Sequence, residues 1–206
     1  MNIMDNIYYL LGAPCSGKTT ISKLLCEKYN ILYYSGDEHR FDYYKNAQIK
    51  IHPWMTKDCK DFFGWTADEM IEWERGVIAE QTPMIIETLN ELALTADKIL
   101  FEGMLDLSVA KNLVKPNRIC YLTVDNEIAK RDFYNRESHE GLLNKIMNDS
   151  LLTEDEKKRR LNMRRQVAIN AFNIDSQIHN IKKYNRTNTS VKEMMEAIEK
   201  HFELER

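Results

Sequence analysis

The sequence predicts an α/β fold: a three-layer sandwich with helices on both faces of a five-stranded parallel sheet. Short apolar runs alternate along the chain with stretches whose apolar residues recur at helical spacing. This alternation is typical of a parallel sheet, because each helix returns the chain to the start of the next strand. The expected strands lie at 7–11, 31–34, 98–103, 119–124 and within 181–185.

Helices are expected in the intervals between these strands. The first runs from Thr19 to Tyr29, and three others begin at capping boxes that open with Thr66, Thr153 and Ser190. Thr82-Pro83 predicts a further helix start, because proline suits the first position of a helix. The remaining expectations are a short helix at 107–114, a turn at 116–117, a helix from about 126 to 136 and a break at 139–141.

Residues 41–65 are rich in aromatic side chains and are expected to be irregular, because Pro53 breaks helical order. These aromatic side chains could wall a substrate pocket, or they could simply cover an edge of the sheet. For any single aromatic residue we favour the second interpretation.

The composition indicates one globular domain over residues 1–206 and argues against two classes of partner. The chain is 43% hydrophobic with a formal net charge of −3, so it offers no strong basic field for a nucleic acid. No run of 18 apolar residues predicts a membrane span. The four cysteines show no paired spacing, which favours a reducing cytoplasm over a disulfide framework or a zinc site. A homodimer stays open.

Residues 12–19 read GAPCSGKT and fit the pattern G-x-x-x-x-G-K-[ST]. A strand precedes the motif and a helix follows it, which is the context that the pattern requires. The two glycines let the backbone curl so that its N–H groups point at phosphate oxygens, and the helix adds its positive end. A chance Gly-rich turn is the alternative. The residues expected to bind nucleotide phosphates are Gly12, Ala13, Pro14, Cys15, Ser16, Gly17, Lys18, Thr19 and Thr20.

Residues 7–20 therefore resemble the Walker A element of the P-loop kinases and ATPases. The resemblance implies that Lys18 reaches the β- and γ-phosphates of ATP and that the Thr19 hydroxyl ligates Mg²⁺. Cys15 lies near a helix N-terminus, where a thiol pKa tends to fall. It could be a redox switch, although we favour a variable loop position.

The order of the remaining features narrows the resemblance. The acidic end of the second strand, a strand ending in Phe-Glu-Gly and a later Arg-rich stretch follow the N-terminal P-loop. Over most of its length the chain is similar to the nucleoside-monophosphate kinase, shikimate kinase and gluconate kinase group of small P-loop kinases. This implies a P-loop kinase fold with an acceptor-binding helical region at about 38–82 and a helical lid at about 137–165.

Asp37 follows the second strand, at the edge of the sheet where ligands of such folds bind. In the resembling kinases an acid at this place holds the acceptor hydroxyl, so Asp37 is expected to orient or deprotonate it. The alternative is that Asp37 caps the next helix. Arg40 is a candidate ligand of an anionic acceptor, and His39 a weaker one.

Glu102 and Gly103 end the third predicted strand. The resemblance places at Glu102 the second acidic residue of P-loop proteins, which supports Mg²⁺, usually through water. Many family members carry aspartate there, so contact with metal and contact with substrate both stay open. Glu87 also follows an apolar run, but Thr82-Pro83 and the helical stripe argue against a strand there.

Arginines are expected to neutralise charge on the phosphoryl group as a lid closes. The resemblance assigns this role to Arg131, Arg136 and Arg164, with Arg131 also at the nucleotide. The alternative for the cationic stretch 157–165 is a solvated helix face, because acidic residues open the same helix. Asn185 begins a loop that would pass over the adenine, or it belongs to an ordinary polar loop.

Together these features predict a kinase that moves the γ-phosphoryl group of ATP, with Mg²⁺, to a hydroxyl or phosphate of a small-molecule acceptor. A narrower alternative is a nucleoside-monophosphate kinase. A different class is a nucleotide-binding switch ATPase with a protein partner. A nucleic-acid-end kinase is disfavoured by the near-neutral charge.

Overall fold

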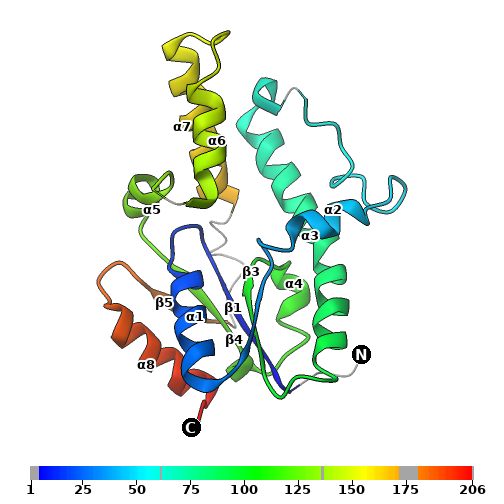
Figure 1. The fold of residues 1–206 in the computed structure, drawn as a ribbon, viewed down its shortest axis with the longest axis vertical. Helices are drawn as coiled ribbons and strands as arrows, with labels where there is room; N and C mark the ends of the chain where they lie inside the picture. Colours follow the sequence, from blue (N-terminus) through cyan, green and yellow to red (C-terminus); the bar gives the residue numbers. More distant parts are fainter. Residues whose placement is uncertain (1–4, 61, 136, 172–180, 206) are drawn as a thin grey trace.

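The computed structural model describes residues 5–60, 62–135, 137–171 and 181–205. Five parallel strands form one sheet in the order β2-β3-β1-β4-β5 (Figure 1). The predicted α/β fold with a five-stranded parallel sheet is confirmed. The strands are β1 (Ile7–Gly12), β2 (Leu32–Ser35), β3 (Ile99–Gly103), β4 (Ile119–Thr123) and β5 (Lys182–Asn185).

Helices flank the sheet and rise beyond its carboxyl-terminal edge (Figure 1). They are α1 (Lys18–Tyr29), α2 (Arg40–Lys45), α3 (Ala67–Leu92), α4 (Leu107–Ala110), α5 (Asn126–Asp132), α6 (Glu137–Met147), α7 (Glu154–Ala171) and α8 (Val191–Phe202), with 3-10 turns at Phe62–Gly64 and Pro116–Arg118. In the part of the chain that the structure describes, no helix is both long and apolar enough to cross a membrane.

Side-chain alternation along β1 divides the core between the two faces of the sheet. Ile7, Tyr9 and Leu11 pack in one buried cluster with residues of α3 and α4. Tyr8 and Leu10 point to the opposite face and pack with α1 and α8. Burial on both faces explains why the central strands read as continuous apolar runs.

The structure corrects the helix start predicted at Thr82-Pro83. α3 is one helix, and Pro83 lies in its interior. The Thr82 hydroxyl donates to a carbonyl oxygen of the preceding turn at 2.7 Å. Val77 and Ile85, on either side of the proline, belong to the same buried cluster. Burial of this common stripe offsets the local cost of proline within a helix.

Other boundaries also differ from the sequence expectation. Residues 40–45 form a helix although the stretch from 41 was expected to be irregular. α4 and α5 end four residues before their predicted ends. The expected break at 139–141 is wrong, because these residues lie inside α6. Gly141 is tolerated inside this helix because α6 packs along α7, and such packing outweighs the low helix propensity of a single glycine.

The aromatic segment packs mainly against α3. The Trp54 ring lies so close to Gly76 that an added Cβ would be 2.3 Å from the ring. The Trp73 indole donates to the Trp54 carbonyl oxygen at 3.0 Å, and Phe62 makes ring contacts with Trp65 and Trp73. The aromatic residues 54–65 therefore cover a helix rather than the edge of the sheet.

Gly12→Ala should lower the free energy of unfolding by about 2–5 kcal/mol. The added Cβ would lie 2.4 Å from the Leu122 carbonyl oxygen, at a φ of +154° that side chains rarely adopt. Urea unfolding followed by circular dichroism measures the effect.

Gly141→Ala is the matched control, because its Cβ would meet nothing within 4 Å and alanine favours a helix. This variant should gain about 0.5–1 kcal/mol. Equal stability of the two variants would contradict the close-approach argument.

Candidate active site

The P-loop forms a cradle between β1 and α1. Cys15 at φ 62° and Gly17 at φ 89° turn the backbone, and Gly17 caps α1. The Ser16 hydroxyl is buried and has no hydrogen-bond partner among the described residues. The cradle therefore presents the positive end of a helix and an unsatisfied hydroxyl to an anion, as a phosphate site requires.

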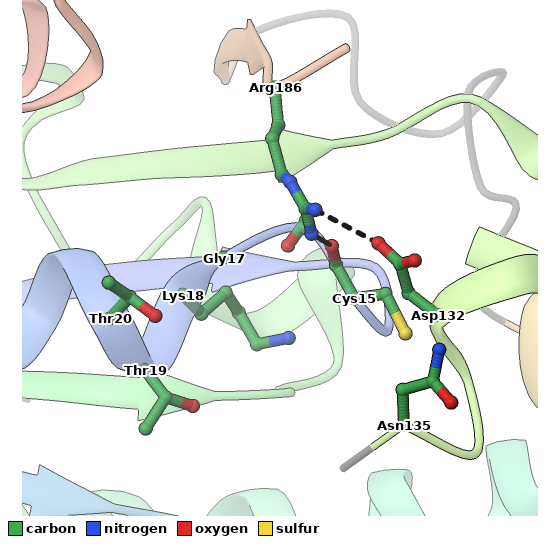
Figure 2. A pocket seen from close by; sticks show the side chains of 9 residues that line it. Cys15, Gly17, Lys18, Thr19, Thr20, Asp132, Asn135 and Arg186 are labelled. Atoms are coloured by element: carbon green, nitrogen blue, oxygen red, sulfur yellow. Dashed lines mark hydrogen bonds and ion pairs between the residues drawn. The ribbon is translucent and has the colours of Figure 1, made fainter. Parts of the chain in front are cut away.

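A pocket of about 270 Å³ opens over this cradle. Figure 2 shows the P-loop residues on one side and side chains from two other elements on the other. This arrangement brings together most of the residues predicted to bind ATP phosphates. The pocket is lined by Cys15, Ser16, Gly17, Lys18, Thr19, Thr20, Asp132, Asn135 and Arg186.

An ion pair that was not predicted from the sequence lies at this pocket. The Arg186 guanidinium lies 3.0 Å from the Asp132 carboxylate and donates to the Cys15 carbonyl oxygen (Figure 2). A hydrogen bond from Arg131, and a further one from Arg186, hold the pKa of Asp132 below its usual value. The sequence does place Arg186 directly after the last strand, in the loop expected near the nucleotide, and this position could have indicated its role.

A buried carboxylate lies beside the P-loop threonine. Glu102 accepts hydrogen bonds at one oxygen from Thr19 at 3.2 Å, Tyr33 at 3.1 Å and Ser35 at 3.1 Å. Burial, and then the charge of Glu102, raise the pKa of Tyr33, so the phenol stays a donor. The second oxygen of Glu102 is buried without a hydrogen-bond partner in the described part of the chain. The two predicted metal residues, Thr19 and Glu102, are thus in direct contact.

A second pocket of about 100 Å³ adjoins the first, and Lys18 lines both. It receives Asp37 and Arg40 from the segment after β2, and Arg164 from α7. The Lys18 ammonium donates to the Ala13 carbonyl oxygen at 3.0 Å. The structure thereby gathers the predicted acceptor residues next to the phosphate cradle. The full lining is Gly12, Pro14, Lys18, Asp37, Arg40, Glu74, Gly103, Met104, Phe133, His139, Arg164 and Ala168.

Glu74 of α3 forms ion pairs with two arginines on different walls of the second pocket. Its carboxylate lies 2.8 Å from Arg164 and 3.7 Å from Arg40, and only 3% of the side chain is exposed. Burial alone would lower the pKa of Arg40, but the charge of Glu74, aided by Tyr44, outweighs it, and the pKa is raised. Glu74 was not predicted from the sequence, although an acid at an apolar position of a helical stripe indicates a compensated buried charge.

Some of the predicted site residues line neither pocket. Arg131 pairs with its neighbour Asp132 at 2.7 Å, and 68% of its side chain is exposed, so it lines neither pocket. Asn185 bonds within its own loop and to Asp125. Arg136 lies outside the described residues. The alternative that Asp37 caps a helix is wrong, because His39 is the N-cap of α2.

The chain is similar in sequence to a kinase. A curated shikimate kinase from Azobacteroides pseudotrichonymphae genomovar. CFP2 is 27% identical over an alignment of 168 residues. The matched region covers 68% of this chain and 92% of that protein. The predicted resemblance to the small P-loop kinases is thereby confirmed. The sequence matches no protein-family model.

Two solved structures extend the comparison. A gluconokinase from Sinorhizobium meliloti 1021 is 10% identical with a TM-score of 0.46, covering 98% of this chain and 94% of that chain. A shikimate kinase from Bacteroides thetaiotaomicron is 14% identical with a TM-score of 0.41, covering 96% and 98%.

Glu74→Gln should destabilise the protein by about 3 kcal/mol, because it leaves two partly buried guanidinium groups without their counter-charge. Thermal unfolding followed by circular dichroism checks this.

Glu156→Gln is the matched control. Glu156 also lies between two arginines, Arg159 and Arg160, but 34% of its side chain is exposed, against 3% for Glu74. Its loss should leave the unfolding temperature unchanged, because surface pairs contribute little. If both variants unfolded alike, the buried carboxylate would not hold the pocket together.

Proposed function

We propose that this chain is a kinase that transfers the γ-phosphoryl group of ATP to a small-molecule acceptor. The observation that carries the proposal is the position of Lys18 on the shared wall of two pockets. One pocket is a phosphate cradle, and the other holds a carboxylate suited to an incoming hydroxyl. A donor and an acceptor bound in these pockets would meet at the lysine, which is the juxtaposition that in-line transfer needs.

Mg²⁺ fits the residues beside the cradle. One Glu102 oxygen, which has no hydrogen-bond partner among the described residues, and the Thr19 hydroxyl are hard oxygen donors. Mg²⁺ in kinases takes few protein ligands and keeps several waters. Thr19 would bind the ion directly and Glu102 through water. When bound, the ion would neutralise charge on the β- and γ-phosphate oxygens.

Asp37 is the proposed general base. It would hold the acceptor hydroxyl in line with the γ-phosphorus and accept its proton as the new oxygen–phosphorus bond forms. The bond from the γ-phosphorus to the bridging oxygen breaks at the same time, and ADP leaves with the electron pair. Asp37 is exposed and lines the second pocket, so an acceptor could reach it.

Cations from three elements would stabilise the charge that develops on the transferred group. Lys18 comes from the P-loop, Arg40 from α2 and Arg164 from α7. Because α7 contacts α3, Arg164 is already beside the pocket rather than remote from it. Donors fixed in this way need little reorganisation during the reaction. We retain Arg131 and Arg136 as proposed lid residues that would approach the nucleotide on closure.

Incubation with labelled ATP, Mg²⁺ and a panel of small hydroxylated and phosphorylated metabolites, with shikimate and gluconate among them, tests the proposal. We expect acceptor-dependent label transfer by the wild type and at least about a 10³-fold loss in Lys18→Ala, since the lysine would contact the transferred group. Circular dichroism shows whether the variant is folded. ATP hydrolysis that no acceptor stimulates would favour the switch ATPase instead.

Asp37→Asn should reduce kcat for acceptor phosphorylation by about 10²–10⁴-fold, the range typical of losing a general base. ATP affinity, measured by isothermal titration calorimetry, should stay within about twofold, because Asp37 does not line the nucleotide pocket. A variant with normal kcat would remove Asp37 from the chemistry.

A homodimer and a cytoplasmic location stay predictions from the sequence. So does the division of the single domain into an acceptor region at about 38–82 and a lid at about 137–165. Arg40 and Glu74 of the first region contact each other, and Arg164 of the second contacts Glu74, which supports the proposal that the two regions face each other at the acceptor pocket.

A further inference from the structure

A narrow cleft of about 50 Å³ continues from the acceptor pocket along α3. It shares Asp37, Arg40, Glu74 and Met104 with that pocket. Farther in, its walls are mainly the apolar side chains Val77, Ile78 and Ile85, together with Gln81. A molecule whose hydroxyl lies at Asp37 could therefore extend an apolar part into this cleft.

Gln81 places an unsatisfied donor in the cleft. The residue is 8% exposed, and its Nε2 is buried without a hydrogen-bond partner in the described part of the chain. A buried amide without a partner is costly, so an apolar residue would be expected at this position of the stripe. A ligand oxygen in the cleft would satisfy this amide.

The charges around the cleft limit what the ligand can carry. The charged side chains that line the acceptor pocket are three cations, Lys18, Arg40 and Arg164, and two carboxylates, Asp37 and Glu74. The same three cations would also stabilise the transferred phosphoryl group. A phosphate dianion on the acceptor would therefore add more negative charge than these cations balance, which is unfavourable in a partly desolvated site.

We propose that this cleft is the acceptor-specificity subsite and that Gln81 donates a hydrogen bond from Nε2 to an acceptor oxygen. The acceptor is a small hydroxylated molecule, neutral or singly charged. Its reacting hydroxyl lies at Asp37, and an apolar part separates that hydroxyl from the oxygen bound by Gln81. This inference rests on the proposed phosphotransfer and narrows its acceptor class.

The first test needs no acceptor. Gln81→Met keeps the side-chain volume and removes the buried donor, so the ligand-free protein should melt about 2–4 °C higher. Gln166→Met, at an exposed position of α7, is the matched control and should melt unchanged. Differential scanning calorimetry measures both. A lower melting temperature for Gln81→Met would mean that the amide serves the folded protein itself, and would overturn the proposal.

The second test uses the acceptors that the wild type phosphorylates in the metabolite panel. For these, Gln81→Met should raise KM about tenfold, the effect of one lost hydrogen bond, while kcat stays within about twofold. Gln166→Met should match the wild type. The nucleoside monophosphates AMP, CMP, GMP and UMP should not be phosphorylated.

The outcomes separate the two levels of inference. No acceptor turnover by the wild type would overturn the proposed function. Turnover with an unchanged KM in Gln81→Met would overturn the subsite alone. Efficient phosphorylation of a nucleoside monophosphate would overturn the charge argument and with it the proposed acceptor class.

Discussion

The close approach of Gly12 to β4 is the constraint on which the site depends. The Ala13 N–H donates to the Leu122 carbonyl oxygen at 3.0 Å, directly after β1 pairs with β4 through Gly12. No side chain fits between these two backbones. The contact fixes where the P-loop leaves the sheet, and hence where the N-terminus of α1 points. The phosphate cradle is therefore a consequence of how the central strands pack.

The register of the sheet then places the acidic groups. Leu11 pairs with Gly103, and Ser35 pairs with Glu102, so the carboxyl ends of β1, β2 and β3 meet at one edge. Because a parallel sheet aligns these ends, residues far apart in sequence become neighbours. Thr19 and Glu102 are 83 positions apart, yet their side chains are hydrogen-bonded. The same edge carries Asp37, two residues beyond β2.

Residues of α3 form one wall of the acceptor pocket at this edge of the sheet. Its buried stripe reads Met70, Glu74, Val77, Gln81 and Ile85, so two polar residues occupy positions that packing alone would make apolar. Glu74 is compensated by arginines of α2 and α7, which draws the acceptor segment and the lid helix onto α3. The Gln81 Nε2 has no hydrogen-bond partner among the described residues. Glu74 thus joins three helices, and Gln81 is the residue that we propose contacts a ligand.

The sequence by itself determined the sheet, its parallel sense and the phosphate cradle. These follow from local patterns: apolar strand runs, capping boxes and the glycine spacing of residues 12–17. Lys18, Thr19, Asp37 and Glu102 could be named for the same reason, since each stands directly beside such a pattern. Pro83 was misinterpreted because a local rule for helix starts was outweighed by burial along the whole of α3.

Only the tertiary structure decided what surrounds these residues. Glu74, Arg186 and Gln81 carry no local motif. The roles of Glu74 and Arg186 arise from contacts across 34 to 171 positions of the chain, and that of Gln81 from the lack of a partner among the described residues. Arg131 matched a family position, but pairing with Asp132 turns it toward solvent. Charge compensation and burial depend on which residues are close in space. A local sequence pattern does not reveal which distant residues become neighbours in the fold. The proposed phosphate-donor site could therefore be predicted from the sequence, while the proposed acceptor site depends on packing.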